Sequence, residues 1–151
     1  MSHAFSPRQS ILLIEDSPED AEATLRSFQK SGLRNPIKRC ENGDEALAYL
    51  FKKNPDQDQP PEPPPGLILL DLNLPGTDGR EVLRTVKADP KLKKIPVIVL
   101  TTSSDERDIE SCYQDGANSY IVKPVEAEGL FTAVLKLKDY WFELVVFPKP
   151  D

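Results

Sequence analysis

The stretch that decides the expected fold of this chain is LILLDLNLPGTDG, at residues 67–79. Four consecutive apolar residues precede Asp71, and such an unbroken run is typical of a strand buried on both faces in a parallel sheet. Pro75, Gly76 and Gly79 then indicate a turn. Asp71 is therefore expected at the carboxyl end of a buried strand, the edge where open α/β sheets bind ligands. Because a buried strand needs no acid at its last position, Asp71 is the first candidate for chemistry.

The same order of an apolar strand, a polar turn and an amphipathic helix extends in both directions from this stretch. Strands are expected at residues 10–14, 36–40, 67–70, 95–100 and 118–122. Helices are expected at 18–31, 43–53 and 79–89, from a cap at Ser104 to about Asp115, and from about Val125 to Val146. This alternation predicts a parallel sheet with right-handed crossovers and helices on both faces, but it does not determine the order of the strands.

The remaining segments are expected to lie outside this fold. We expect a single domain at residues 10–147, a disordered or arm-like N-terminus at 1–9 and a short tail at 148–151. Residues 54–66 are dense in proline and acids, which predicts an exposed loop inserted before the third strand. A proline-rich ligand for an SH3 domain is the alternative interpretation of that segment.

The composition limits the function classes. The chain has 151 residues and a net charge of −6, which argues against a nucleic-acid-binding surface and suits a divalent cation. Its two cysteines form no C-x-x-C pair, so a disulfide framework is not expected. The first ten residues do not resemble a signal peptide, and no apolar run approaches the ~20 residues that span a membrane. We therefore expect a cytoplasmic protein.

Polar side chains follow four of the expected strands. Glu15 and Asp16 follow the first strand, Asp71 the third, Thr101 the fourth and Lys123 the fifth. Because the carboxyl ends of parallel strands meet at one edge of the sheet, these residues are expected to converge. The expected site therefore contains three carboxylates, one hydroxyl and one ammonium.

The chemistry of this set is that of phosphoryl transfer. Three neighbouring acids repel one another, so they either raise a pKa or hold a cation, and an all-oxygen set suits Mg²⁺. A carboxylate beside a metal ion and Lys123 can act as a nucleophile on a phosphoryl group, while Thr101 donates a hydrogen bond. The only histidine, His3, is far from these strand ends, which excludes zinc and Ser-His chemistry there.

Each of these residues also has an ordinary structural explanation when it is taken alone. Asp71 could simply end a strand, and Glu15 with Asp16 could simply begin a helix. Thr101 could be an ordinary strand residue, and Lys123 a surface lysine. Their joint occurrence at the ends of different strands favours a functional site.

These motifs resemble the receiver domain of two-component response regulators, over about residues 10–146. The resemblance rests on Glu15-Asp16, on Asp71 with Pro75 and Asp78-Gly79, on Thr101, and on Lys123-Pro124. It implies a flavodoxin-like α/β fold with a five-stranded parallel sheet in the order 2-1-3-4-5, which is the strand order of the chemotaxis receiver.

The resemblance also implies roles. Asp71 would accept a phosphoryl group from a histidine kinase, and Lys123 would contact that group. Glu15, Asp16 and Asp71, with the backbone carbonyl of Asn73, would hold Mg²⁺. The protein would then be a phosphoacceptor in signalling and not an enzyme with an external substrate.

Thr101 and Tyr120 are implied to switch position on phosphorylation. From the residues alone, Tyr120 could equally be a static core residue, because it alternates with Ile121 on a short strand. Thr102 stands where many members of the family have alanine, so it is expected beside the phosphoryl group and could narrow access to it. Asn73 and Ser103 flank the site and could affect the lifetime of the phosphate.

A narrower resemblance is to the single-domain regulators that are paired with bacterial and cyanobacterial phytochromes. It rests on residues 17–20, 71–76 and 101–103 and on an aromatic C-terminus, and it implies a phytochrome-like kinase as partner. With no output domain expected, signalling would proceed through protein contacts or onward transfer to a phosphotransfer protein. No nucleic-acid or membrane partner is expected.

The end of the last helix carries more apolar residues than one helix face can bury. We expect a homodimer through this helix and the fifth strand, and the alternative is a tail folded back onto its own core. The residues expected at the interface are Tyr140, Trp141, Phe142, Val145 and Phe147.

Two other functions remain open from the residues. One is a Mg²⁺-dependent phosphatase or phosphotransferase that uses Asp71 on an external substrate. Enzymes of the haloacid dehalogenase kind usually carry a second acid two residues after the nucleophile, where this chain has Asn73, and they need a cap domain. The other is a receiver-like binding module that is not phosphorylated.

Overall fold

The computed structural model describes residues 9–51 and 63–148. Its centre is a five-stranded parallel sheet in the order β2-β1-β3-β4-β5, as the family resemblance implied. The strands are β1 (Ile11–Ile14), β2 (Ile37–Cys40), β3 (Leu67–Leu70), β4 (Val97–Thr101) and β5 (Ser119–Val122). The helices are α1 (Pro18–Lys30), α2 (Gly43–Leu50), α3 (Gly79–Ala88), α4 (Glu106–Gln114), α5 (Ala127–Leu137) and the π-helix η1 (Lys138–Leu144).

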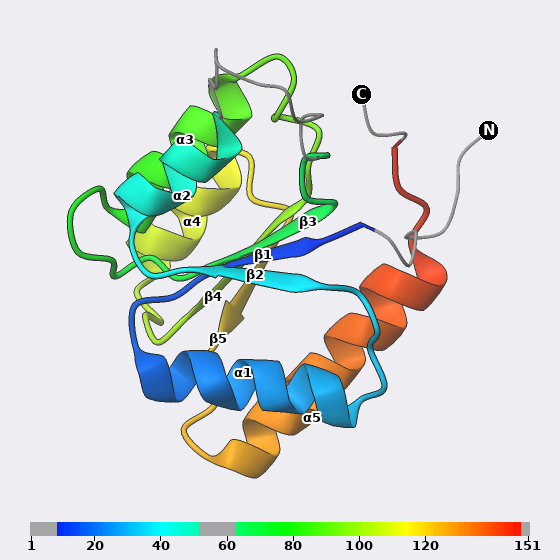
Figure 1. Ribbon diagram of the computed structural model, residues 1–151. Coiled ribbons are helices and arrows are strands. Elements are labelled where there is room, and N and C mark those ends of the chain that lie inside the picture. The colour runs from blue at the N-terminus through cyan, green and yellow to red at the C-terminus, as the bar shows by residue number, and fades with distance from the viewer. Residues whose placement is uncertain (1–8, 52–62, 149–151) are drawn as a thin grey trace.

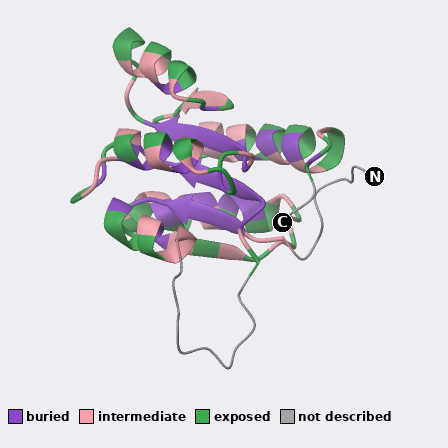
Figure 2. Cartoon of the chain, turned by 90° about the horizontal axis from the view of Figure 1, so that it is seen from above, coloured by how far each residue is buried: buried purple, intermediate pink, exposed green. Residues whose placement is uncertain are grey.

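Helices cover both faces of the sheet. In Figure 1, α1 and α5 lie on one face, and α2, α3 and α4 lie on the other. The central strands are buried throughout, because their side chains supply the two apolar cores between the sheet and these helices (Figure 2). This burial explains why β1 and β3 are uninterrupted apolar runs, whereas the edge strand β2 has the charged residues Lys38 and Arg39 at its centre.

The parallel register places the functional residues at one edge of the sheet. Ile14 is paired with Leu70 in the register, so Glu15 and Asp71 leave neighbouring strands at the same level. The Asp71 N–H donates to the Ile14 carbonyl at 3.0 Å, and the Lys123 N–H donates to the Thr101 carbonyl at 2.7 Å. The predicted convergence of strand ends is therefore confirmed.

Local sequence accounts for most helix ends. Ser17 caps α1 by accepting from the Asp20 N–H, with Pro18 at the first position, as its sequence indicates. The chain leaves α4 at Gly116, whose φ of +103° favours glycine. The prediction that Ser104 caps α4 is wrong: Asp105 is the cap, because its carboxylate accepts from the Arg107 N–H.

The last helix differs from the expected single helix ending at Val146. It is α-helical only to Leu137 and then widens into η1, which ends in a 2.9 Å hydrogen bond from the Val145 N–H to the Tyr140 carbonyl. Trp141 in this segment and Phe147 beyond it are 8% and 4% exposed and pack edge to face. Part of the C-terminus is therefore folded back onto the core of its own chain.

The predicted arm at residues 1–9 and the loop at 54–66 fall mainly on residues outside the described ranges, as does the tail beyond Pro148. Where the chain re-enters the described part, the Gly66 N–H donates to the Ser10 carbonyl at 2.9 Å beside the start of β1. Within residues 9–51 and 63–148, no helix has the length and apolar character needed to cross a membrane.

Candidate functional site

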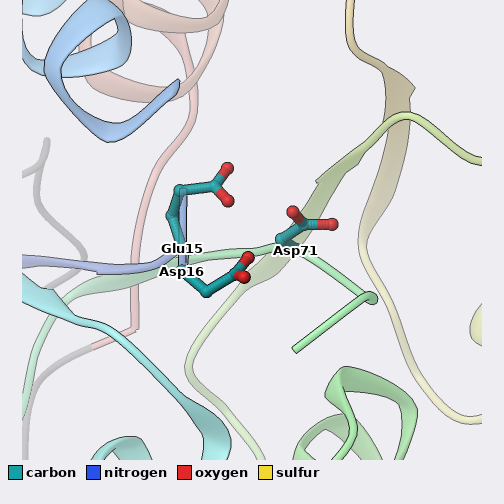
Figure 3. Close-up of side chains that lie close together, drawn as sticks. All are labelled: Glu15, Asp16 and Asp71. Carbon is teal, nitrogen blue, oxygen red and sulfur yellow. The ribbon is translucent and has the colours of Figure 1, made fainter. Parts of the chain in front are cut away.

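Three carboxylates gather where β1 and β3 end (Figure 3). One oxygen from each of Glu15, Asp16 and Asp71 lies within 4.8 Å of the others. Glu15 and Asp71 are only 2% and 7% exposed, whereas Asp16 faces solvent. Two buried acids and one exposed acid at an open edge form a site that a cation can reach from water.

Lys123 places a positive charge against this cluster from the end of β5. Its ammonium pairs with Glu15, with Asp71 at 3.1 Å and with Asp20 of α1 at 3.0 Å. The Lys123 side chain is only 7% exposed. An ammonium carries three donors, so these three acids satisfy it completely.

The surroundings separate the protonation behaviour of the two buried acids. Burial raises the pKa of Glu15 to about 7, although the hydrogen bond from Lys123 opposes this rise. Burial also acts to raise the pKa of Asp71, but the hydrogen bond from Thr101 and the charge of Lys123 outweigh it and lower the pKa overall. Asp71 is therefore the carboxylate that stays ionised and available as a nucleophile.

Thr101 and Asn73 contact the same oxygen of Asp71. The fully buried Thr101 hydroxyl donates to Asp71 Oδ1 at 2.8 Å, and the Asn73 N–H donates to that oxygen at 3.3 Å. Lys123 contacts the other oxygen, Oδ2. Thr102 lies next in the chain on the exposed side. Both oxygens of Asp71 are thus held in fixed directions by the strand ends around them.

A second charge network begins where the loop after Thr101 leaves the sheet. Arg80 of α3 donates to both oxygens of Asp108 of α4 at 2.8 Å, and to Asp78 at 3.0 Å. The Ser103 hydroxyl donates to Asp108 at 2.7 Å, and the Tyr120 hydroxyl donates to the Ser103 carbonyl at 2.8 Å. The half-buried Tyr120 is therefore tied to the loop that follows Thr101.

The donor set suits a hard divalent ion. Glu15, Asp16 and Asp71 offer only oxygen ligands, and the exposed side of Asp16 leaves room for waters, as Mg²⁺ prefers. The Asn73 N–H donates to Asp71 Oδ1, so the residue whose carbonyl is predicted to be a ligand is next to this cluster. The residues present therefore fit such an ion.

Comparison with known proteins identifies the family. The response regulator receiver domain family matches residues 11–135. This chain belongs to that family. The response regulator Rcp1 of Synechocystis sp. PCC 6803 is 38% identical over 148 residues, which cover 98% of this chain and 99% of Rcp1.

Solved receiver structures agree over nearly the whole chain. A crystal structure of the phosphorylated cyanobacterial phytochrome response regulator RcpA has a TM-score of 0.85 and 37% identity, covering 94% of this chain and 99% of RcpA. The Mn²⁺-bound form of Rcp1 has a TM-score of 0.84 and 38% identity, covering 93% and 99% of the two chains. The predicted resemblance to receiver domains, and to the phytochrome regulators among them, is confirmed.

Two parts of this receiver site were not predicted from the sequence. Asp20 reaches Lys123 from α1, and Arg80 links α3 to α4 through Asp108. The signal for Asp20 was present, since a cap at Ser17 places the third residue of α1 near the end of β1. The pairing of Arg80 with Asp108 has no signal along the chain, because 28 residues separate them.

The residues expected at a dimer interface fall into three groups. Tyr140 is 53% exposed, Phe142 and Val145 are half-buried, and Trp141 and Phe147 are buried in their own chain. Trp141 and Phe147 therefore expose little surface to a partner, and the interface itself stays a prediction. Leu144 and Val146, which were not among the expected interface residues, are 69% and 60% exposed.

Proposed function

We propose that Asp71 is the phosphoryl acceptor of this response regulator receiver. The observation that carries the proposal is the surroundings of its carboxylate, which lies between the Lys123 ammonium and the Thr101 hydroxyl and beside Glu15 and Asp16. The lowered pKa keeps it ionised. A buried strand end gains no stability from such a cluster of acids, whereas a phosphoryl group needs its nucleophile and its counter-charges in this arrangement.

The reaction requires no proton transfer to or from the nucleophile. An Asp71 oxygen attacks the phosphorus of a phosphohistidine in a histidine kinase or of an acyl phosphate, and the bond from phosphorus to the donor nitrogen or oxygen breaks. The product is an aspartyl phosphate together with the released donor. Lys123 offsets charge on the transferred oxygens, and Thr101 donates a hydrogen bond to the group.

Glu15, Asp16 and Asp71, with the Asn73 carbonyl, would hold Mg²⁺ in this proposal. The ion would supply further positive charge beside the transferred group. The protein's own part is to keep Asp71 ionised and its oxygens aimed. Thr102 stands at the exposed side of the site, where it would limit access to the phosphoryl group.

Incubation with acetyl phosphate and Mg²⁺, followed by intact mass, tests the proposal. Wild type is expected to gain one phosphoryl group, and the Asp71→Asn variant is expected to gain none. Absence of an adduct on wild type would favour a binding module that is not phosphorylated. Rapid turnover of small phosphate esters would instead favour an enzyme with an external substrate.

We infer that the donor in the cell is a sensor histidine kinase of the phytochrome type. The support is the identity over nearly full length to Rcp1, together with the likeness to the phytochrome response regulator RcpA. Phosphotransfer from a purified phytochrome kinase should be faster than from an unrelated kinase, and equal rates would contradict the inference.

We further propose that Thr101 and Tyr120 report the phosphorylation. The Tyr120 hydroxyl donates to the Ser103 carbonyl, in the loop that follows Thr101. A shift of the Thr101 hydroxyl toward a phosphoryl group on Asp71 would therefore move the acceptor of this Tyr120 hydrogen bond. NMR signals of Tyr120 should change on phosphorylation in wild type and not in Thr101→Ala. Onward transfer of the phosphoryl group from Asp71 to a phosphotransfer protein is a second output that we propose.

A homodimer through the C-terminal segment and β5 remains our proposal for the assembly. Its support is an exposed apolar group at the end of the chain, formed by Tyr140, Leu144 and Val146, with Val122 exposed on β5. Sedimentation equilibrium of Tyr140→Glu should give a lower mass than wild type. An unchanged mass would contradict this interface.

A further inference from the structure

The third partner of Lys123 has no role in the function proposed so far. Asp20 Oδ2 lies 3.0 Å from the Lys123 ammonium, as close as Asp71 at 3.1 Å. Asp20 does not belong to the group of acids that can hold a metal ion. Its contact with Lys123 therefore needs an explanation of its own.

The three acids around Lys123 are not equivalent. The side chains of Glu15 and Asp71 are 3% and 9% exposed, so their bonds to the ammonium lie in a medium of low dielectric constant. The Asp20 side chain is 47% exposed. Water screens its attraction to Lys123 and can replace the bond when it breaks.

Asp20 is also held in place by interactions that do not involve Lys123. Its N–H donates to the Ser17 hydroxyl at 3.2 Å, and its carbonyl accepts from the Thr24 hydroxyl at 2.8 Å. It lies in the first turn of α1, where a carboxylate is stabilised by the positive end of the helix. Asp20 can therefore release the lysine without becoming an unsatisfied buried charge.

A phosphoryl group on Asp71 would bring new acceptor oxygens to an ammonium whose three donors are already engaged. Because esterification removes the charge of Asp71, the donor that faced Asp71 passes to the phosphoryl group first. For a second donor to follow, the bond to Glu15 or the bond to Asp20 must yield, and the bond to the exposed Asp20 costs less to break. We propose that Asp20 is a positioning residue that holds the third donor of Lys123 in the unphosphorylated protein and gives it up to the phosphoryl group. This inference rests on Asp71 being the acceptor.

The consequence is that Asp20 competes with the phosphoryl group for Lys123 and slows phosphorylation. Asp20→Asn keeps the shape of the side chain and removes its charge, so the ammonium should turn more readily toward the phosphoryl oxygens that arrive at Asp71. We expect phosphorylation by acetyl phosphate to become about two- to five-fold faster, the scale of an exposed ion pair. This corresponds to about 0.4 to 1 kcal/mol at about 1.4 kcal/mol per tenfold.

The experiment measures the initial rate of Asp71 adduct formation with acetyl phosphate and Mg²⁺ by intact mass. Glu22→Gln is the matched control, because Glu22 lies on the same helix, is 69% exposed and pairs with Arg26. The Asp20→Asn change is also made in a Lys123→Met background, where it should have no effect. Calorimetric titration with beryllofluoride and Mg²⁺ should show tighter binding to Asp20→Asn by a similar factor.

Three results would overturn the inference: an unchanged or slower rate in Asp20→Asn, an equal acceleration in Glu22→Gln, or an acceleration that persists without Lys123. If Asp20→Asn melts well below wild type, Asp20→Ser replaces it, because serine is also favourable in a first helical turn. If wild type forms no adduct, the proposed role of Asp71 is contradicted. That result differs from the three above, so a failure of the Asp20 inference can be told apart from a failure of the proposed function.

Discussion

Two charge networks lie at the carboxyl edge of the sheet, and each is built around one cation. Lys123 contacts Glu15, Asp20 and Asp71, while Arg80 contacts Asp78 and Asp108. Both networks join elements that are distant in the sequence. They differ in burial, since the Lys123 side chain is 7% exposed and that of Arg80 is 29% exposed.

They differ more deeply in the balance of charge. Three acids contact Lys123, and Asp16 adds a further carboxylate beside Glu15 and Asp71, whereas Arg80 contacts two acids. Arg80 meets Asp108 in a two-pronged pairing, in which the fork of the guanidinium matches the two carboxylate oxygens. An excess of acid around a buried ammonium costs folding free energy and fits a site for a divalent cation, whereas the two-pronged contact of Arg80 with Asp108 fits a structural link between α3 and α4.

The largest expected difference between the networks is in phosphorylation. Lys123→Met should slow adduct formation from acetyl phosphate by about 100-fold, because it removes a preorganised positive charge from the transferred oxygens. Arg80→Met should change the rate less than about threefold, because the guanidinium contacts neither oxygen of Asp71. Intact mass over time measures both rates. A similar loss of phosphorylation rate in the two variants would contradict the assignment of the Lys123 network to function and of the Arg80 network to structure.

The second difference concerns pH and the metal ion. Burial raises the pKa of Glu15 to about 7, so near pH 6 a proton competes with Mg²⁺ for this carboxylate, and near pH 8 it does not. The affinity for Mg²⁺ should therefore rise roughly tenfold from about pH 6 to about pH 8. Calorimetric titration measures it, and Asp108→Asn should keep the same slope. An affinity that stays flat across this range would contradict ligation by Glu15.

The smallest expected effect is on stability at the Arg80 network. Asp108→Asn should cost about 1 kcal/mol in urea unfolding at neutral pH, the scale of a partly exposed ion pair. The hydrogen bond from Arg80 lowers the pKa of Asp108 from 3.8 to about 2, so the contribution is complete above about pH 4 and is lost toward pH 2. The difference between wild type and Asp108→Asn should shrink over that range. A constant difference would show that the charge of Asp108 is not responsible.

The site residues at the strand ends were predictable because parallel strands of one sheet all end at the same edge. Because parallel strands end at one edge, Glu15, Asp71 and Lys123 could be placed together from apolar runs alone. The rule says nothing about helices that approach the same edge. The rule therefore does not place Asp20, which in the structure pairs with Lys123 from α1.

The C-terminal segment shows the opposite case. Its aromatic residues predicted an apolar surface, but their directions depend on how the last turns are wound. Trp141 is buried one turn after the buried Leu137, whereas Tyr140 is 53% exposed, and these are neighbouring residues with similar aromatic side chains. Composition cannot separate them, because burial depends on the angle at which each side chain leaves the helix.

The sequence by itself determined the strands, their alternation with helices and the acids, hydroxyl and lysine at the strand ends, since these follow from local periodicity and from the geometry of parallel sheets. Tertiary structure alone decided which helix residues complete the site, how Arg80 joins α3 to α4, and which aromatic residues face the core. Those outcomes depend on the packing angles between elements, which result from the whole core and are not encoded in any one stretch of the chain.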